Sequence, residues 1–287
     1  NEEEALIDVL RLSKGMTYKA AIAGLKLGGG KSVIIGDSKK NKTTDLFESF
    51  GDFVNSLNGK YITAEDVGTS EKDMEAVLRR TVHVTGVSKN LGGGGDPSPI
   101  TAYGTYVGIK ASANYKLNVS SLSGLKIVVQ GVGSVGESLI AHLCNDGADI
   151  YINDIDIDKM ESVSNKYNVK TIDVKDLYSF DADIYAPCAL GATVNDLTVN
   201  QFKYSIIAGA ANNVLLDPIK HGSALMDRGI LFAPDYVINA GGLINVANEI
   251  DGYSEQQVKA ETEKIYDTLL NIYKISDREG IPTSEAS

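Results

Sequence analysis

Three glycines in a fixed spacing, Gly131, Gly133 and Gly136, form the most informative chemical pattern in the chain. They follow the β-branched run 126–130 and precede a helical pattern, and a second apolar run then ends at Asp154. In a βαβ unit of this kind the first glycine permits a tight turn, the second lets backbone N–H groups approach a pyrophosphate, and the third lets helix and strand pack closely. The negative phosphates would face the positive end of the helix.

The position of Asp154 completes this pattern, because its carboxylate can accept hydrogen bonds from an adenosine ribose. A carboxylate there would also repel the 2′-phosphate of NADP, so the sequence favours NAD as the cofactor. The alternative, a glycine-rich turn that serves packing alone, stays open. The residues predicted to meet the cofactor here are Gly131, Val132, Gly133, Ser134, Val135, Gly136 and Asp154.

Two lysines upstream, Lys19 and Lys31, lie in a setting that is unusual for surface lysines. Small apolar residues flank Lys19, and residues 28–30 before Lys31 are all glycine, which lets another group approach the backbone. A phosphate-binding P-loop is excluded, because it needs glycine where Leu25 stands and a helix where a strand pattern follows Lys31. Two lysines with aliphatic stems lying along the surface remain an alternative interpretation. Asp66 follows a short predicted strand and could be a functional carboxylate or a helix cap.

The elements that must position these residues alternate between short apolar strands and amphipathic helices, which predicts an α/β fold. We expect a first α/β block over 1–95, a Rossmann-like doubly wound parallel sheet over 96–250, and a C-terminal helix within 251–287 that returns to the first block. The glycines and prolines of 92–99 mark the break between the blocks. In the first block the patterns predict helices at 2–14, 44–57 and 71–79, and strands at 31–35 and 61–63. In the second they predict a helix at 101–115 and strands at 126–130, 149–153, 183–186, 205–210 and 230–234. A final helix is predicted at 255–278, with an apolar stripe that consists of Val258, Ile265, Leu269, Ile272 and Ile275.

Composition restricts the classes of function. With 287 residues and 43% hydrophobic content, the chain can bury a large core and form about two domains. A net charge of −11 argues against nucleic acid as a partner. The chain has two cysteines, Cys144 and Cys188, in apolar surroundings, which is typical of reduced residues in a cytoplasmic protein. Three histidines without ligand spacing predict no metal site, and no apolar run is long enough to span a membrane. The first helix has no partner before it, so we expect that residues upstream are absent from this sequence.

Seven ordered motifs resemble one enzyme family, the NAD-dependent Glu/Leu/Phe/Val amino-acid dehydrogenases, and most of all its leucine-type members. The resemblance extends from about Leu10 to Pro282. The motifs are GMTYKAAIAGLKLGGGK, YITAEDVGT, PSPITAYG, GVGSVG, YAPCALGA, IAGAANN and PDYVINAGGLINV. The resemblance implies a two-domain fold in which a smaller substrate and oligomerisation domain accompanies the nucleotide domain. It also implies a homo-oligomer, from dimer to octamer.

The resemblance further implies roles for individual residues. Lys19 would bind the substrate α-carboxylate, Lys31 would be the catalytic lysine, and Asp66 would exchange protons with the substrate amine. Thr101, Asn213 and Asn239 would orient the nicotinamide amide and the amino acid. Further cofactor contacts would come from Cys188, Ala189 and Asn213, and Asn213 would also contact the substrate.

The activity implied is oxidative deamination of branched-chain L-amino acids to 2-oxo acids and ammonia, with NAD, in a reversible reaction. In this family the positions of Ala64, Leu243 and Val246 line the pocket for the substrate side chain. All three are apolar here, so a glutamate carboxylate would be buried without a partner. Phenylalanine or tryptophan as substrate stays open. A non-catalytic NAD-binding protein is a further alternative, although it would not need Lys19, Lys31 and Asp66 together.

Overall fold

The computed structural model describes residues 1–189 and 191–287, and these residues form two units. The first unit consists of Asn1–Pro97 and Gly242–Ala260, and the second of Ser98–Gly241 and Glu261–Ser287. Each unit is described by itself below. Leu190, within the motif YAPCALGA, lies outside the described residues.

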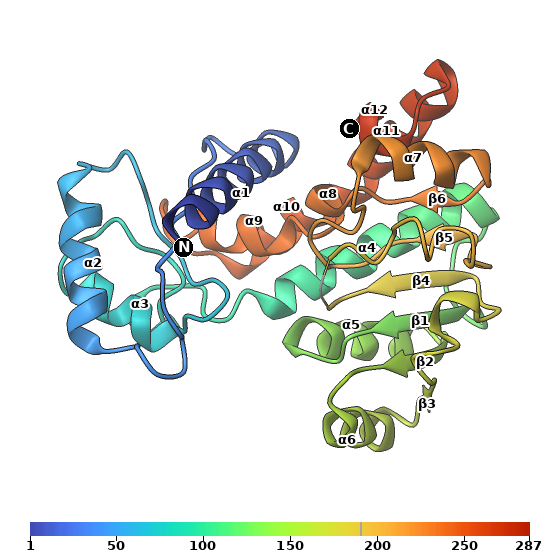
Figure 1. The fold of residues 1–287 in the computed structure, drawn as a ribbon, viewed down its shortest axis with the longest axis horizontal. Coiled ribbons are helices and arrows are strands. Elements are labelled where there is room, and N and C mark those ends of the chain that lie inside the picture. Colours follow the sequence, from blue (N-terminus) through green and yellow to red (C-terminus); the bar gives the residue numbers. More distant parts are fainter. Residues whose placement is uncertain (190) are drawn as a thin grey trace. The chain divides into compact units, whose positions relative to one another are not determined.

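The second unit is organised around a six-stranded sheet in which every neighbouring pair of strands is parallel (Figure 1). The strand order is β3-β2-β1-β4-β5-β6, so the chain reverses its direction of travel across the sheet between β1 and β4. This order confirms the predicted doubly wound sheet. The strands are β1 (Lys126–Gln130), β2 (Asp149–Asn153), β3 (Lys170–Thr171), β4 (Ile184–Pro187), β5 (Ile206–Ile207) and β6 (Leu231–Phe232).

Burial explains which strands the sequence revealed. Ile127, Val128 and Val129 of β1 are fully buried, and all residues of β4 are buried, as expected for central strands covered on both faces. The edge strand β3 was not predicted, because its two residues are polar and exposed and give no apolar signal.

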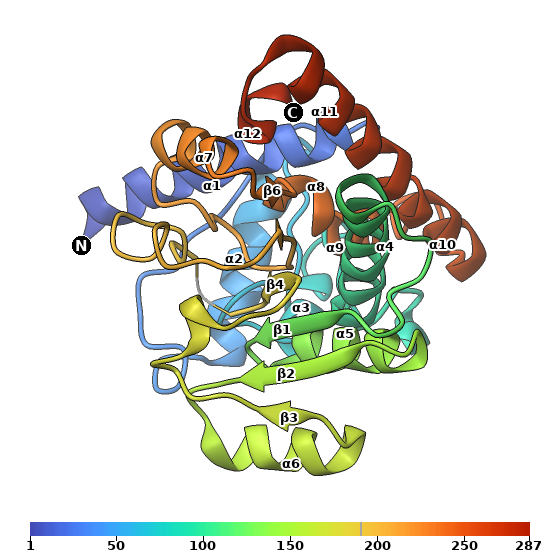
Figure 2. The ribbon, with the colours of Figure 1, turned by 90° about the vertical axis from the view of Figure 1, so that its right-hand side faces the viewer.

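Helices accompany the sheet, and their ends follow recognisable caps. Asp156 accepts a hydrogen bond from the N–H of Lys159 at the start of α6, and Asp217 caps α7, which has Pro218 in its first turn. Figure 2 shows α6 next to the edge strand β3, with α4 and α5 beside each other. The helices of this unit are α4 (Ser98–Leu117), α5 (Ser134–Asn145), α6 (Ile157–Tyr167), α7 (Pro218–Asp227), α8 (Asp235–Ile238), α11 (Ile265–Glu279) and α12 (Thr283–Ala286), with a short 3₁₀ helix, η2 (Leu177–Ser179).

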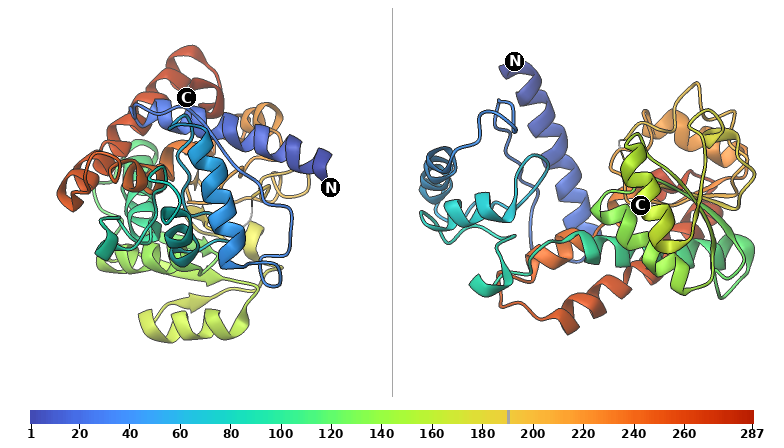
Figure 3. Two further views of the ribbon diagram at one scale, coloured as in Figure 1. Left: turned by 90° about the vertical axis from the view of Figure 1, so that its left-hand side faces the viewer. Right: turned by 90° about the horizontal axis from the view of Figure 1, so that it is seen from below.

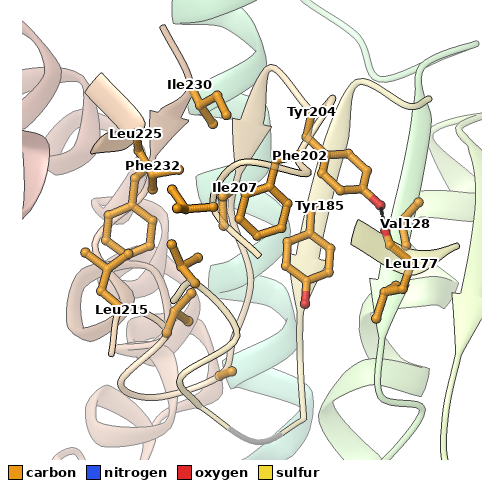
Figure 4. Packing of buried hydrophobic residues seen from close by; sticks show 14 of the residues in the cluster. Val128, Leu177, Tyr185, Phe202, Tyr204, Ile207, Leu215, Leu225, Ile230 and Phe232 are labelled. Atoms are coloured by element: carbon orange, nitrogen blue, oxygen red, sulfur yellow. Dashed lines mark hydrogen bonds between the residues drawn. The ribbon is translucent and has the colours of Figure 1, made fainter. Parts of the chain in front are cut away.

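An aromatic cluster forms the core on one side of the sheet (Figure 4). The rings of Tyr185 and Tyr204 stack with centroids 5.2 Å apart, and Phe202 lies 5.9 Å from Tyr185. The Tyr204 hydroxyl donates a hydrogen bond to the carbonyl of Leu177, so the buried phenol has a partner.

The C-terminal helix differs from the prediction. The chain forms two helices, α10 (Glu255–Glu263) and α11, separated at Lys264, rather than one. Of the predicted apolar stripe, Val258, Ile265, Leu269 and Ile272 are buried. The helix α11 packs on α4 of the second unit, whereas α10 up to Ala260 belongs to the first unit. The hydroxyls of Ser112 and Tyr273 are 2.7 Å apart in this interface, and both residues are fully buried. The stripe predicted a buried face but not the helix that covers it.

The first unit is helical in the residues described (Figure 3). The helix α2 packs against α3, and the apolar side chains between them include Phe47, Met74 and Val77. The predicted strand at 31–35 is wrong for the described chain, because no strand lies beside these residues and Val33, Ile34 and Ile35 are exposed. The strand at 61–63 is reduced to an isolated parallel bridge from Thr63 to Val84. The elements are α1 (Glu2–Ile22), α2 (Thr44–Ser56), α3 (Glu71–Leu78), a short 3₁₀ helix η1 (Lys89–Leu91) and α9 (Gly241–Ala247), which lies at the unit boundary, followed by the first part of α10.

Two helix limits predicted from the sequence, the end of α1 and the start of α4, also differ from the structure. The helix α1 continues through Gly15 to Ile22, past the predicted end at Lys14, because residues after Gly15 are mostly good helix formers and Gly24, with φ +68°, provides the stop. A capping box at Asn1 begins this helix. The helix α4 starts at Ser98, earlier than predicted, with Pro99 in its first turn.

Candidate active site

The glycine loop after β1 has the geometry that its spacing predicted. Gly131 has φ +95°, a conformation that favours glycine, and it turns the chain directly after the strand. A Cβ added to Gly136 would stand 2.0 Å from the Gly131 carbonyl oxygen, so only glycine fits there. Gly133 directly precedes α5 as its N-cap, and a Cβ added to it would meet no protein atom within 4 Å. The first and third glycines are therefore needed for the turn and its packing, whereas Gly133 faces open space.

Asp154 follows β2 and lies at the same edge of the sheet. Its Oδ2 accepts a hydrogen bond from the Val132 N–H at 2.7 Å, and its Oδ1 accepts one from the Asp156 N–H at 2.9 Å. Each carboxylate oxygen has a second lone pair, so ribose hydroxyls could still donate to this half-buried group. The carboxylate thus connects the end of β2 to the glycine loop.

The residues after β4 lie against the same loop. The Cys188 N–H donates to the Gln130 carbonyl at 2.7 Å, and a Cβ on Gly131 would be 2.8 Å from the Cβ of Ala189. Burial raises the pKa of the Cys188 thiol to about 11, so this cysteine is a neutral thiol at physiological pH. Because β1 and β4 adjoin where the strand order reverses, Cys188 and Ala189 lie at the crevice where doubly wound sheets bind ligands.

Asn239 offers an unsatisfied acceptor at this edge of the second unit. Its Nδ2 donates to the Ala210 carbonyl at 3.0 Å and to Asn212 Oδ1 at 2.8 Å, whereas its Oδ1 is buried without a hydrogen-bond partner. Buried acceptors normally have a partner, and the NH₂ of a nicotinamide amide is a donor of the required kind. Sequence reasoning missed Asn212, although the paired asparagines of IAGAANN were a signal for it.

The two remaining cofactor candidates lie in different surroundings. Thr101 lies in the first turn of α4, and a Cβ added to Gly241, two residues after Asn239, would stand 3.2 Å from its Cα. Asn213 is exposed in a left-handed conformation, φ +52°, and its carbonyl accepts the Ala192 N–H at 2.7 Å. The backbone of Asn213 therefore shapes the loop, while its side chain remains available.

In the first unit, folding brings Lys31 and Asp66 together. The Lys31 ammonium forms an ion pair with the Asp66 carboxylate, and the two side chains are 22% and 47% exposed. The turn after Ala64 orients Asp66: its N–H donates to Thr69 Oγ1 at 2.8 Å, and the Thr69 hydroxyl donates back to the Asp66 carbonyl at 2.7 Å. A partly desolvated lysine paired with an accessible carboxylate can accept and release protons in turn.

The three glycines before Lys31 were predicted to let another group approach the backbone, but two of them are required by contacts within the chain itself. A Cβ on Gly29 would lie 2.1 Å from the Ser13 carbonyl oxygen, and one on Gly30 would lie 2.9 Å from the Tyr61 ring. Only Gly28 of the three has no protein atom near the added Cβ. These glycines therefore let the chain pass close to α1 and to Tyr61, which fixes the approach to Lys31.

The other predicted substrate residues also belong to the first unit. Lys19 is half-buried in the last turn of α1, beside the fully buried Ala20. Leu243 and Val246 lie three residues apart on α9, so they share one half-exposed face of that helix. Ala64 is half-buried directly before the Glu65–Asp66 turn. The assignment of these residues to a substrate pocket stays a prediction.

Over residues 1–189 and 191–287, no group of three or more His, Cys, Asp and Glu side chains could hold a metal ion. In the same residues, none of the helices combines the length and apolar character needed to cross a membrane. Cys144 and Cys188 are free thiols.

Similar proteins were found over both units. A family model described as "Glu/Leu/Phe/Val dehydrogenase, dimerisation domain" matches residues 1–83, and one described as "Glutamate/Leucine/Phenylalanine/Valine dehydrogenase" matches residues 151–280. The leucine dehydrogenase of Bacillus subtilis (strain 168) is 50% identical over 282 residues, which cover 98% of this chain and 77% of that protein.

The L-tryptophan dehydrogenase of Nostoc punctiforme is 46% identical over 287 residues, covering all of this chain and 80% of that protein. A crystal structure of L-tryptophan dehydrogenase from the same organism superimposes with a TM-score of 0.86 at 44% identity, over 100% of this chain and 82% of that one. Identity of this degree over nearly the whole length exceeds what a shared fold alone would explain. The chain belongs to the Glu/Leu/Phe/Val dehydrogenase family, whose members are amino-acid dehydrogenases.

Proposed function

We propose that this protein catalyses the reversible, NAD-dependent oxidative deamination of branched-chain L-amino acids, with leucine as the main substrate and valine and isoleucine as further ones. The observation that carries the proposal is the ion pair of Lys31 with Asp66 in a chain that is 50% identical to a leucine dehydrogenase. A non-catalytic nucleotide-binding protein would have no use for this pair.

The balanced reaction converts the amino acid, NAD⁺ and water into a 2-oxo acid, ammonium, NADH and a proton. When bound, NAD supplies the acceptor for the hydride that leaves the α-carbon. Lys19 binds the α-carboxylate through a charge-assisted hydrogen bond. Lys31 first passes its own proton to Asp66 and, as a neutral amine, then takes a proton from the water molecule that attacks the oxidised α-carbon. Asp66 transfers protons to the nitrogen until ammonia departs.

The second unit has residues that suit the cofactor. The N–H groups of the Gly131–Gly136 loop would hold the pyrophosphate, Asp154 would accept the ribose hydroxyls, and Asn239 Oδ1 would accept the carboxamide NH₂. The carboxylate of Asp154 favours NAD over NADP, because the extra phosphate would bring like charges together. The other residues that we propose to contact the cofactor are Thr101, Cys188, Ala189 and Asn213.

Three apolar residues of the first unit, Ala64, Leu243 and Val246, would form the wall that meets the substrate side chain. A branched aliphatic chain gains free energy by leaving water for such a lining, at about 25 cal/mol per Å² of apolar surface. A glutamate carboxylate would lose its hydration without gaining a partner. The wall therefore favours leucine, valine and isoleucine over glutamate.

We also propose that the protein forms homo-oligomers through its first unit. Residues 1–83 match a dimerisation-domain model, and large apolar side chains of this segment are exposed. Four large apolar side chains are each about 60% exposed, namely Leu6, Leu10, Ile35 and Phe53. Contact of apolar side chains with water is unfavourable, so an interface that covers them would stabilise the protein.

We further propose that the protein acts in the cytoplasm, because its two free thiols suit a reducing compartment.

The test is NADH formation measured by absorbance in the full-length chain, over leucine, valine, isoleucine, phenylalanine, tryptophan and glutamate, with NAD and with NADP. We expect the branched-chain substrates with NAD to be fastest. Lys31→Ala should lower kcat on the order of 10²-fold or more while NADH binding persists. Lys26→Ala, an exposed lysine of the same segment, is the matched control and should change neither. Full turnover by Lys31→Ala, or glutamate as the fastest substrate, would contradict the proposal.

Tryptophan and phenylalanine form the second candidate substrate class, because the Nostoc punctiforme enzyme is nearly as similar as the leucine dehydrogenases. The same panel separates the two classes. A value of kcat/KM for tryptophan above that for leucine would favour the second.

A further inference from the structure

A partly buried carboxylate, Glu249, lies two residues after α9 in the first unit. Its Oε2 accepts a hydrogen bond from the Gly86 N–H at 2.9 Å. Its Oε1 is buried without a direct partner and would be 3.1 Å from a Cβ added to Gly94. Burial raises the pKa of Glu249, and the backbone N–H groups of Gly94, Gly86 and Val87 oppose that shift. Withdrawing a carboxylate from water is costly, so its contacts need a reason beyond filling space.

The hydrogen bond from Gly86 connects Glu249 with the segment next to the turn that contains Asp66. Val84, two residues before Gly86, pairs with Thr63, and the Thr85 N–H donates to the Thr63 carbonyl at 2.8 Å. Gly86 itself has φ +75°, and a Cβ added to it would stand 3.1 Å from the backbone nitrogen of Glu65. Glu249 therefore holds the segment that lies against the backbone between Ala64 and Asp66.

Gly94, the residue near Glu249 Oε1, also lies against the face of α9 opposite Leu243 and Val246. Asn245 is fully buried, and its Oδ1 accepts a hydrogen bond from the Tyr253 hydroxyl at 2.8 Å. A Cβ on Gly94 would lie 2.7 Å from both Asn245 Nδ2 and the Tyr253 ring. The buried face of α9 is thus packed tightly, and its other face is left with the two apolar side chains.

We propose that Glu249 is a positioning residue that sets the spacing between two walls of the amino-acid side-chain pocket. Through Gly86 it couples α9, with Leu243 and Val246, to the backbone that carries Ala64 and Asp66. The inference rests on the proposed function and adds a determinant of specificity to it. A hydrogen bond from a backbone N–H to a carboxylate is short and directional, so it holds this spacing more tightly than apolar packing does. Displacement of about 1 Å in such a site can cost on the order of 10²-fold in rate.

Substitution of Glu249 in the full-length protein tests this assignment. Glu249→Ala removes the acceptor, and we expect kcat/KM for leucine to fall about tenfold or more. Because loosened walls admit a larger side chain, the ratio of kcat/KM for leucine to that for phenylalanine should fall by about tenfold as well. Glu249→Gln keeps an oxygen that can accept the Gly86 N–H, so it should restore most of the ratio. Asp251→Ala, an exposed carboxylate two residues further on, is the matched control and should leave the ratio unchanged.

Glu249→Asp covers the case in which the alanine variant does not fold. It retains the charge but is one methylene too short to reach the Gly86 N–H, and it should lower the same ratio. Loss of thermal stability with an unchanged leucine-to-phenylalanine ratio, in either the alanine or the aspartate variant, would assign Glu249 a purely structural role and overturn the inference. If the wild type itself oxidises no amino acid, the proposed function fails and the inference fails with it. A wild type that oxidises leucine while the variants keep its selectivity refutes the inference alone.

Discussion

Substitutions of two glycines in the loop 131–136 should have different effects, one on stability and the other on cofactor binding. In Gly136→Ala the new methyl group would stand 2.0 Å from the Gly131 carbonyl oxygen, whereas ordinary contacts of a Cβ begin at 3.4 Å. The backbone must move by more than 1 Å to relieve this overlap, as the difference between 2.0 and 3.4 Å shows. In Gly133→Ala the methyl group meets no protein atom within 4 Å, and the φ of −64° suits alanine.

The magnitudes follow from these contacts. Overpacking of this kind costs roughly 1–3 kcal/mol. We expect the upper part of that range for Gly136→Ala, because the Cβ has no rotamer freedom and the oxygen that it meets is a backbone atom of the same turn. At about 2–4 °C per kcal/mol for a unit of this size, its Tm should fall by roughly 4–12 °C. Gly133→Ala loses only a weak advantage of glycine at the first position before α5, which is worth under about 1 kcal/mol. Its methyl group would instead occupy the space where a pyrophosphate must approach the N–H groups.

Thermal unfolding without ligands and titration of NADH fluorescence measure the two effects in the same samples. Gly136→Ala should have a lowered Tm, and Gly133→Ala should have a near-native Tm with NADH binding weakened by about tenfold or more, the loss of one charge-assisted hydrogen bond. Native affinity for NADH in Gly133→Ala would refute the assignment of this loop as the pyrophosphate site. An unchanged Tm in Gly136→Ala would refute the steric argument.

Three further predictions concern other parts of the molecule. Asp154→Ser removes the carboxylate that accepts the Val132 N–H, so the KM for NAD should rise about tenfold and NADP should become a better substrate; an unchanged cofactor preference in steady-state kinetics would contradict this. Tyr273→Phe removes a hydroxyl 2.7 Å from that of Ser112, which keeps a second partner, so urea unfolding should show a loss of about 0.5–1.5 kcal/mol. Burial raises the pKa of Glu249 above its ordinary 4.5. The folded protein therefore binds the proton of the Glu249 carboxyl more tightly than the unfolded chain does. The stability that this protonated carboxyl contributes is lost as the pH rises through the folded pKa. The free energy of unfolding should therefore decline less with rising pH in Glu249→Gln, and parallel curves for the two proteins would show that this group does not titrate as described.

The second unit was predictable because its signals are local. The turn at Gly131, the close packing at Gly136 and the strand before them depend on residues within a few positions of one another, and their spacing is enough to specify the geometry. The buried strands β1 and β4 are continuous apolar runs that need no knowledge of their neighbours. The edge strand β3 is polar and exposed, and so it escaped prediction.

The first unit was harder to predict, because its chemistry depends on contacts between distant segments. The sequence alone indicated that Lys31 and Asp66 were candidates, but only folding brought an ammonium and a carboxylate 35 positions apart into an ion pair. The apolar run 31–35 predicted a strand, yet a strand exists only where another strand accepts its hydrogen bonds, and none does so in the described chain. The stripe of α11 likewise determined that one face would be buried, while its packing on α4 was decided by tertiary structure. Glu249 depends most clearly on tertiary structure. Nothing in the sequence distinguishes it from other glutamates, and its proposed role follows only from the hydrogen bond that its side chain accepts from the Gly86 N–H in the folded chain. Local spacing specifies turns and periodic faces, whereas the choice of partner depends on long-range packing that no window of sequence contains.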